Sequence, residues 1–414
     1  MLAKNILILS LVHVVRLILP LLVIPILTRR ITPNDFGIYM YAISFSAWLS
    51  IFVEYGFNIS STREIAEKKN VREIFSVVAG TQSAKILLLL TSIPLLVFAI
   101  FFVPIFDGYW YWAVTAWLLG ILTAFLPIYY FQGRENLKLV GITEIFCGLL
   151  MLGAVYVFIH DADELYRLAI IVIISRVISL SLLSWKMYAE NDIRGLAFFN
   201  LQDGILNLKN GFNLFVFQGA VSLYTSFNVV LLGFYCSPAQ VGAYAFAERL
   251  MRAGIGFLGQ FSNAIFPRLN ALKEKFPEKM EKLRLQVLIS FLILGIVGML
   301  ATWEISPYIV MYMFAGEVDK VNKILWILGL IVPAISISNV LGYQYLLVDR
   351  REKLFNIIIF CAAIINVTMA FFLIRHYEAE GMAISWVLVE WMIAFVIAIA
   401  VFVLARQKKS TITD

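Results

Sequence analysis

The chain has 414 residues, of which 61% are hydrophobic and 14% are charged, and its formal net charge is +6. A mean hydropathy of +0.88 excludes a soluble globular protein and predicts an integral membrane protein. The apolar runs are about twenty residues long and lack strict alternation, so they predict helices and exclude a β-barrel. The three cysteines and three histidines are scattered along the chain, so we expect no disulfide framework, no metal site and no cofactor.

Twelve apolar runs, separated by polar or turn residues, predict an all-α polytopic membrane protein with about twelve transmembrane helices. In chain order they cover residues 5–27, 36–57, 75–103, 109–131, 139–160, 168–186, 212–235, 242–266, 287–314, 324–348, 354–374 and 381–405. The first run ends in Thr28-Arg29-Arg30 instead of a small-residue cleavage site. We therefore expect it to be retained as a span.

The basic residues predict the orientation of these helices. If the N-terminus is cytoplasmic, 22 lysines and arginines fall in inside segments and only six in outside loops. Such an asymmetry predicts that both termini are cytoplasmic. It also explains the positive net charge without a nucleic-acid partner, because anionic lipids attract basic cytoplasmic segments.

The second half of the chain repeats part of the first. A shift of 205 residues aligns PNDFGIYMYA, which begins at Pro33, with PAQVGAYAFA, which begins at Pro238. The aligned identities are Pro33/Pro238, Gly37/Gly242, Tyr39/Tyr244, Ala42/Ala247, Asn58/Asn263 and Arg63/Arg268. Six spans in each half give both halves the same orientation. We predict two parallel six-helix bundles, residues 1–205 and 206–414, around a central cavity.

Charged residues inside the predicted spans indicate what such a cavity holds. Arg16 lies in the middle of the first run, too far from either end for its side chain to snorkel, so we expect it to face a wet interior or to pair with a neighbouring helix. The other basic residues inside spans are Lys85, Arg176, Arg249 and Arg252. Two of these have simpler explanations: Lys85 could snorkel to the inner surface, and Arg252 could pair with Glu248 four residues earlier.

Several unpaired cations at one depth repel one another in a low dielectric, so they predict an anionic ligand. Arginine can hold a phosphate through two parallel hydrogen bonds, which makes a phosphate or diphosphate headgroup the predicted ligand. We place Arg252 and Arg249 first among the binding residues, followed by Arg16, Arg176 and Lys85. The candidates for ion coupling are Glu54, Glu144 and Glu390.

Six short motifs lie beside or within the predicted spans: LT with PNDFGIY (27–28, 33–39), FVEYGFN (52–58), FQGRE (131–135), AIFPR (264–268), SISNVLG (336–342) and EGMA (380–383). Together they resemble the Wzx-type O-antigen flippases, which belong to the polysaccharide transport family of the MOP flippase superfamily. The resemblance runs over essentially the whole chain. It implies a MATE-like fold without enzymatic activity.

The resemblance also implies a cargo. Family members move undecaprenyl-diphosphate-linked oligosaccharide units from the cytoplasmic to the periplasmic leaflet of the bacterial inner membrane, so the implied partners are this glycolipid, membrane lipids and the O-antigen polymerase machinery. Arg249 and Arg252 match the cationic eighth span of the family, whereas Arg16 and Arg176 match no motif.

Two alternatives remain at this point. A MATE-like antiporter shares the duplicated plan, but a cavity with surplus arginines suits cationic drugs poorly. A membrane-embedded polysaccharide polymerase would need a sizeable extramembrane loop, and the longest predicted outside loops have about ten residues. The sequence also lacks the nucleophile-elbow and His-Glu-x-x-His motifs.

Overall fold

The computed structural model describes residues 19–161, 164–189 and 199–413, and every regular element within these ranges is a helix. Eight helical stretches in this part of the chain are long and apolar enough to cross a membrane. Only helices satisfy their own backbone polar groups while their side chains face lipid, so the chain is a multi-pass membrane protein. Contacts divide it into two compact units, the first ending at Gly242 and the second beginning at Ala243.

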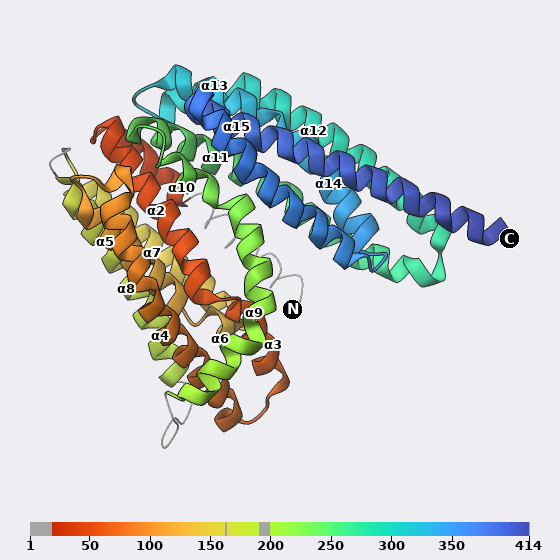
Figure 1. Ribbon diagram of the computed structural model, residues 1–414, viewed down its shortest axis with the longest axis horizontal. Coiled ribbons are helices and arrows are strands. Elements are labelled where there is room, and N and C mark those ends of the chain that lie inside the picture. Colours follow the sequence, from red (N-terminus) through yellow and green to blue (C-terminus); the bar gives the residue numbers. More distant parts are fainter. Residues whose placement is uncertain (1–18, 162–163, 190–198, 414) are drawn as a thin grey trace. The chain divides into compact units, whose positions relative to one another are not determined.

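The first unit begins, among the described residues, with a short apolar helix over 19–28. Its later helices are α2 (Pro33–Glu54), α3 (Phe57–Glu67), α4 (Val71–Phe102), α5 (Trp110–Phe125), α6 (Ile128–Gly133), α7 (Leu137–Phe158), α8 (Leu165–Ala189), α9 (Leu201–Thr225) and α10 (Phe227–Leu232), as Figure 1 shows. A 3₁₀ turn, η1 (Pro104–Phe106), joins α4 to α5. Within the unit, α2 packs on α5, α4 on α9, and α7 on α8.

The second unit contains most of α11 (Pro238–Lys275), followed by α12 (Pro277–Met313), α13 (Val318–Gly329), α14 (Ile331–Asn339), the π-helix η3 (Val340–Leu347) and α15 (Glu352–Thr413). α12 packs on α13 and α14, and α15 packs on α13, α14 and η3. α15 consists of two helices joined at Glu378, whose φ of 51° and ψ of −131° are not helical.

Where the structure describes them, the predicted spans are helical, although their bounds and divisions differ from those predicted. The runs predicted at 354–374 and 381–405 are the two parts of α15, on either side of Glu378. The run at 324–348 is divided among α13, α14 and η3. The first run, 5–27, is described only from residue 19 onward.

The start of α2 shows how local sequence sets a helix boundary. Pro33 occupies the first helical turn, and the side chain of Thr32 accepts a hydrogen bond from the backbone N–H of Asp35 at 3.2 Å. Both features are typical of helix N-termini. The helix ends in the EYGFN motif, where Tyr55 and Gly56 have φ values of 55° and 86°. This left-handed pair reverses the chain into α3, and a glycine suits it because it has no Cβ.

Two segments related by the sequence repeat contact each other inside the first unit. The backbone N–H of Ala239 donates to Asn34 Oδ1 at 3.2 Å, and these residues are 205 positions apart. A Cβ on Gly37 would lie 1.7 Å from the carbonyl oxygen of Pro238, and a Cβ on Gly242 would lie 2.9 Å from Gly37 Cα. The repeat-related glycines are therefore needed for a backbone-to-backbone approach.

Packing places α9 and α10 with the first unit. The Oγ of Ser83 on α4 accepts from the backbone N–H of Asn200 at 2.8 Å, just before α9. On α10, the carbonyl of Val230 accepts a hydrogen bond from the Tyr41 hydroxyl of α2 at 3.4 Å. The division into bundles at 205/206 is based on the repeat and stays a prediction, whereas contacts divide the chain after Gly242.

Candidate functional site

In the second unit, Arg252 lies between a carboxylate and an aromatic ring. Arg252 and Glu248 lie one turn apart on α11, and Glu248 Oε1 accepts hydrogen bonds from Arg252 Nε at 3.2 Å and from Nη2 at 2.6 Å. Glu248 is 7% exposed, whereas the Arg252 side chain is 37% exposed. The predicted intrahelical pair is therefore confirmed. The guanidinium group of Arg252 nevertheless remains partly exposed.

The ring belongs to Trp386 on the second part of α15. Its centroid lies 4.6 Å from the Arg252 guanidinium carbon, which is within the range of a cation–π contact. The indole N–H of the same residue donates to Glu390 Oε1 at 3.2 Å. Trp386 and Glu390 are both buried. The predicted binding residue Arg252 and the predicted coupling residue Glu390 thus contact the same indole.

Arg249 lies half-buried three residues before Arg252 on α11. Residues three apart on a helix lie on neighbouring faces, so both guanidinium groups occupy one stretch of α11. Arg249 takes part in an interaction of its own. Chemically, two guanidinium groups on one helix can bind a phosphate or diphosphate through charge-assisted, bidentate hydrogen bonds.

In the first unit, Arg176 is not an unpaired cation, so that expectation is wrong. Its Nη1 lies 3.0 Å from Glu144 Oε1, joining α8 to α7, and the Ser179 hydroxyl donates to the same oxygen at 3.3 Å. The sequence prediction failed here because the pair joins two helices, and spacing within one helix does not reveal it. Glu144, a candidate for ion coupling, is the counter-ion of this pair.

Lys85 does not snorkel to a surface, so that alternative is wrong as well. Its side chain is completely buried, and its amine donates to the carbonyl oxygen of Ala124 at 2.7 Å. The amine also lies 4.7 Å from the centroid of the Tyr129 ring. Ala124 is in the last turn of α5, where carbonyls have no intrahelical partner, so Lys85 completes the end of that helix.

Glu54, the third coupling candidate, is at the end of α2. Its Oε1 accepts a hydrogen bond from the backbone N–H of Asn58 at 2.6 Å, which satisfies a donor in the first turn of α3. Glu54 also interacts electrostatically with Lys85. Arg16, the remaining predicted binding residue, lies outside the described residues. Within the described ranges, no group of histidine, cysteine and acidic side chains could hold a metal ion.

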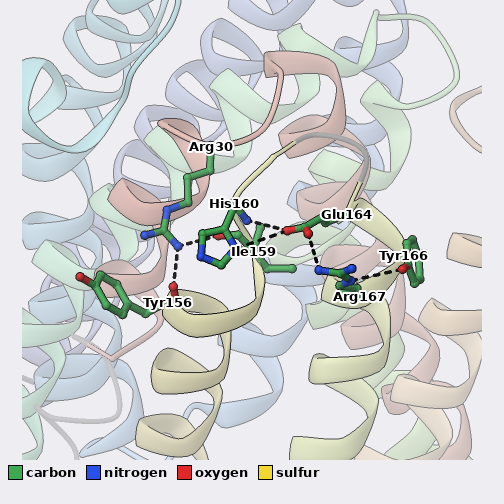
Figure 2. Close-up of polar contacts among 7 residues, drawn as sticks. All are labelled: Arg30, Tyr156, Ile159, His160, Glu164, Tyr166 and Arg167. Atoms are coloured by element: carbon green, nitrogen blue, oxygen red, sulfur yellow. Dashed lines mark hydrogen bonds and ion pairs between the residues drawn. The ribbon is translucent and has the colours of Figure 1, made fainter.

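A separate polar cluster connects the segment after the first helix to the α7–α8 turn (Figure 2). Arg30 Nη1 donates to the carbonyls of Tyr156 and Ile159 at the end of α7, at 2.7 and 2.5 Å. Glu164 accepts from the backbone N–H of His160 at 2.7 Å and is paired with Arg167. The hydrogen bond from His160 is the main reason why the pKa of Glu164 lies below its ordinary value. Cations at a helix C-terminus stabilise it, so this cluster has a structural explanation.

The sequence analysis did not identify two features of the second unit. Trp386 stands four residues before Glu390, and this i, i+4 spacing could have indicated it. Arg284, on α12, is almost completely buried. It donates to the Gln344 carbonyl of η3 at 2.8 Å and pairs with Asp349 at 3.0 Å. Arg284 therefore connects α12 to η3 and to the turn after η3. No pattern along the chain predicts these partners.

Comparisons with known proteins agree with the fold and the motifs. The family profile described as "Polysaccharide biosynthesis protein" matches residues 2–273. A protein of Shigella dysenteriae named "Putative O-antigen transporter" is 29% identical over 94% of this chain and 97% of its own length. The predicted resemblance to O-antigen flippases is confirmed by these two matches.

Solved structures of the MOP superfamily share the fold. A multidrug resistance MATE family transporter in an inward-facing conformation has a TM-score of 0.74, 14% identity and coverage of 96% of this chain and 95% of its own. The Lipid II flippase MurJ in an inward closed conformation has a TM-score of 0.71, 14% identity and coverage of 96% and 87%. The predicted all-α, MATE-like fold class is confirmed.

Proposed function

This chain belongs to the family of polysaccharide biosynthesis proteins, and we propose that it is a flippase for lipid-linked oligosaccharides. The cargo is a repeat unit of the O-antigen type on undecaprenyl diphosphate. The protein moves it from the cytoplasmic to the periplasmic leaflet of a bacterial inner membrane. Both termini are cytoplasmic in this proposal, which follows from the distribution of basic residues.

The proposal rests on the partner and the exposed fraction of the Arg252 side chain. A guanidinium inside an apolar helix is costly unless it faces a polar cavity or a partner. Arg252 has a carboxylate partner, yet 37% of its side chain is exposed, and Arg249 stands three residues away on the same helix. A diphosphate supplies the negative charge that such a pair of arginines can bind.

The other predicted binding residues receive different roles. Lys85 and Arg176 each have a local partner in the first unit, so we propose that they support the helices there and do not contact cargo. Arg16 stays a proposed contact on the argument of its depth in the first apolar run.

The chemistry of the cargo explains why a protein is needed. A prenyl tail can remain in lipid throughout the movement, whereas the diphosphate and sugars cannot cross hydrocarbon. In our proposal Arg252 and Arg249 hold the diphosphate while the sugars remain hydrated, and alternating access exposes the headgroup first to one side and then to the other. No chemical bond changes, so the protein is not an enzyme in this proposal. The polymerase machinery would receive the translocated unit.

Reconstitution tests the proposal directly. The purified protein in liposomes should move a defined prenyl-diphosphate oligosaccharide between leaflets, measured by the accessibility of the glycan to an added enzyme that modifies sugars. Protein-free liposomes provide the baseline. Failure to move any such lipid, with or without an ion gradient, would contradict the proposed function, and drug export by the same protein would favour a MATE-like antiporter.

Cells provide the matching genetic test. Arg252→Ala and Arg249→Ala should abolish surface polysaccharide while the protein stays in the membrane, because each loses a charge-assisted hydrogen bond that is equivalent to about tenfold or more in affinity. Arg268→Ala is the matched control, since Arg268 is an exposed arginine on the same helix. Normal surface polysaccharide in both Arg252→Ala and Arg249→Ala would overturn the cationic site.

A further inference from the structure

One indole contacts both a predicted binding residue and a predicted coupling residue. The Trp386 ring stacks on the Arg252 guanidinium, with its centroid 4.6 Å from the guanidinium carbon. Its N–H donates to Glu390 Oε1 at 3.2 Å. Trp386 is 3% exposed and Glu390 is 5% exposed. A buried, rigid side chain therefore lies between a cation that is open to the surroundings and a carboxylate that is not.

These contacts fix the orientation of the guanidinium. Glu248 Oε1 accepts from Nε and Nη2 along one edge of the Arg252 group, and the indole ring lies against the group, with its centroid 4.6 Å from the guanidinium carbon. An arginine binds a phosphate in a bidentate manner only when the planar fork is correctly directed. Holding the guanidinium through both contacts before cargo arrives reduces the entropy lost on binding.

We propose that Trp386 is a positioning residue that directs Arg252 toward an anionic headgroup and makes the affinity of Arg252 depend on the charge of Glu390. This inference rests on the proposed function, because it takes Arg252 as a cargo contact. Trp386 itself touches Arg252 and Glu390 and acts through them.

The dependence on Glu390 follows from electrostatics. A negative charge beside the indole opposes the positive charge of Arg252, so an ionised Glu390 weakens the attraction for a diphosphate and a protonated one strengthens it. By linkage, binding of the anion then favours uptake of a proton at Glu390. A coupling of this kind would connect cargo binding to a proton gradient.

The charged groups on the helices that pack against α15 are the other charges to compare with Glu390 as the source of this effect. Neither α14 nor η3 contains a charged residue. On α13 the charged residues are Asp319, Lys320 and Lys323; Lys320 pairs with Glu317, and Lys323 pairs with Glu380, ten residues before Glu390. On α11, Arg252 lies against the indole, Glu248 is paired with Arg252, and Arg249 stands three residues before Arg252.

The test is a binding measurement on the purified full-length protein in detergent. Farnesyl diphosphate is the probe, because it combines a prenyl chain with the diphosphate, and calorimetry measures its affinity at pH 7.5 and pH 5.5. Trp386→Leu removes both contacts and should weaken binding by about 2- to 30-fold, the range expected from a cation–π contact. Trp386→Phe retains a ring and the packing, so it should fold normally and lose less affinity.

Trp391→Phe is the matched control. Trp391 lies on the same helix, and its indole N–H donates to the Leu330 carbonyl at 3.1 Å, so the substitution removes the same kind of donor away from Arg252. We expect its affinity to equal that of the wild type. In an Arg252→Ala background, Trp386→Leu should cause no further loss, because a positioning residue has nothing left to position.

Glu390→Gln tests the second part of the proposal. It keeps an acceptor for the indole N–H while removing the charge, and at pH 7.5 it should bind the probe about fivefold more tightly or better. Between pH 7.5 and pH 5.5 the affinity of the wild type should rise relative to that of this variant, because protonation of the probe's terminal phosphate affects both proteins equally and only the wild type can take up a proton at Glu390. An unchanged affinity and pH profile in Glu390→Gln would overturn the role of Glu390.

The remaining outcomes separate this inference from the proposed function. Wild-type affinity in both Trp386 variants, or an equal further loss in the Arg252→Ala background, would overturn the positioning role while leaving Arg252 as a cargo contact. If the wild type does not bind the probe, or if Arg252→Ala binds it equally well, the proposed cationic site and this inference both fail.

Discussion

The charged residues of the first unit contrast with those of the second. Lys85 is completely buried and donates to a helix-end carbonyl, and Arg176 forms a bridge from α8 to α7. Arg252, in the second unit, is held by a carboxylate on its own helix and by an indole, and it remains partly exposed. Depth in a transmembrane helix therefore did not distinguish these cations, whereas their partners and exposure do.

The repeat-related helices α2 and α11, one beginning in each half of the chain, also differ in their charges. Their first residues are alike, and their later residues are not. Both start with a proline and place a glycine at the backbone contact between Gly37 and Gly242. About two to three turns after these glycines, the positions in α2 that correspond to Arg249 and Arg252 hold Ser44 and Ala47. The duplicated feature is thus a packing contact, and the cationic feature belongs to a single copy.

The largest expected loss of stability is at Lys85. Lys85→Met keeps most of the apolar stem but leaves the Ala124 carbonyl without its donor and removes the charge that opposes Glu54. We expect a decrease of about 3 kcal/mol in the free energy of unfolding, measured by SDS titration of the purified protein. Lys138→Met is the control, because Lys138 is exposed. Equal stabilities would show that Lys85 is not a structural residue.

A slightly smaller loss is expected where the repeat-related segments meet. Gly37→Ala places a Cβ 1.7 Å from the Pro238 carbonyl oxygen, so the two backbones must separate, at a cost of about 1–3 kcal/mol. Gly153→Ala on α7 is the matched control, since nothing lies within 4 Å of its Cβ position, and it should gain up to about 1 kcal/mol in helix propensity. A stable Gly37→Ala variant would argue against this contact.

Arg176→Ala should have a moderate effect. It leaves the Glu144 carboxylate without its counter-ion, but both side chains are partly exposed, at 28% and 15%, so solvent reduces the expected loss to about 1 kcal/mol. The double variant Arg176→Gln with Glu144→Gln should recover part of that loss, because no unpaired charge remains. The same SDS titration measures the single variants Arg176→Gln and Glu144→Gln and the double variant. An additive loss in the double variant would mean that the two residues do not act as a pair.

The smallest change in stability, and the clearest test of the contrast, comes from replacing arginine by lysine at both positions. Arg176→Lys and Arg252→Lys keep the charge near Glu144 and Glu248, so each should change stability by less than about 1 kcal/mol. Only Arg252→Lys should reduce transport in liposomes, by about tenfold, because lysine lacks the bidentate fork. Equal transport rates in the two variants would remove the distinction between structural and cargo-binding arginines.

Much of the fold could be predicted from the sequence because lipid imposes strong constraints on a chain. A span needs about twenty apolar residues, and turns between spans need polar, proline or glycine residues. The predicted runs consequently match the described helices closely, including the break in α15 at Glu378. Divisions within a run were not predicted: the π-helix η3 and the change from α5 to α6 depend on how neighbouring helices pack.

The candidate site was predictable to the extent that its members lie on one helix. The pair of Glu248 and Arg252 follows from four-residue spacing, and it was predicted for that reason. The partners of Arg176 and Lys85 lie on other helices, at separations of 32 and 39 residues. Such contacts depend on the rotation of each helix about its own axis, which no local pattern specifies.

The sequence by itself determined that this protein is an all-helical membrane protein, because hydropathy is a property of the chain, and it showed a 205-residue repeat and basic residues within apolar runs. Only the tertiary structure decided that Lys85 and Arg176 have partners on neighbouring helices and that Arg252 remains partly exposed. It also brought Trp386 against Arg252. The physical reason is that a buried charge selects its partner by proximity in space, and proximity between different helices is set by their packing.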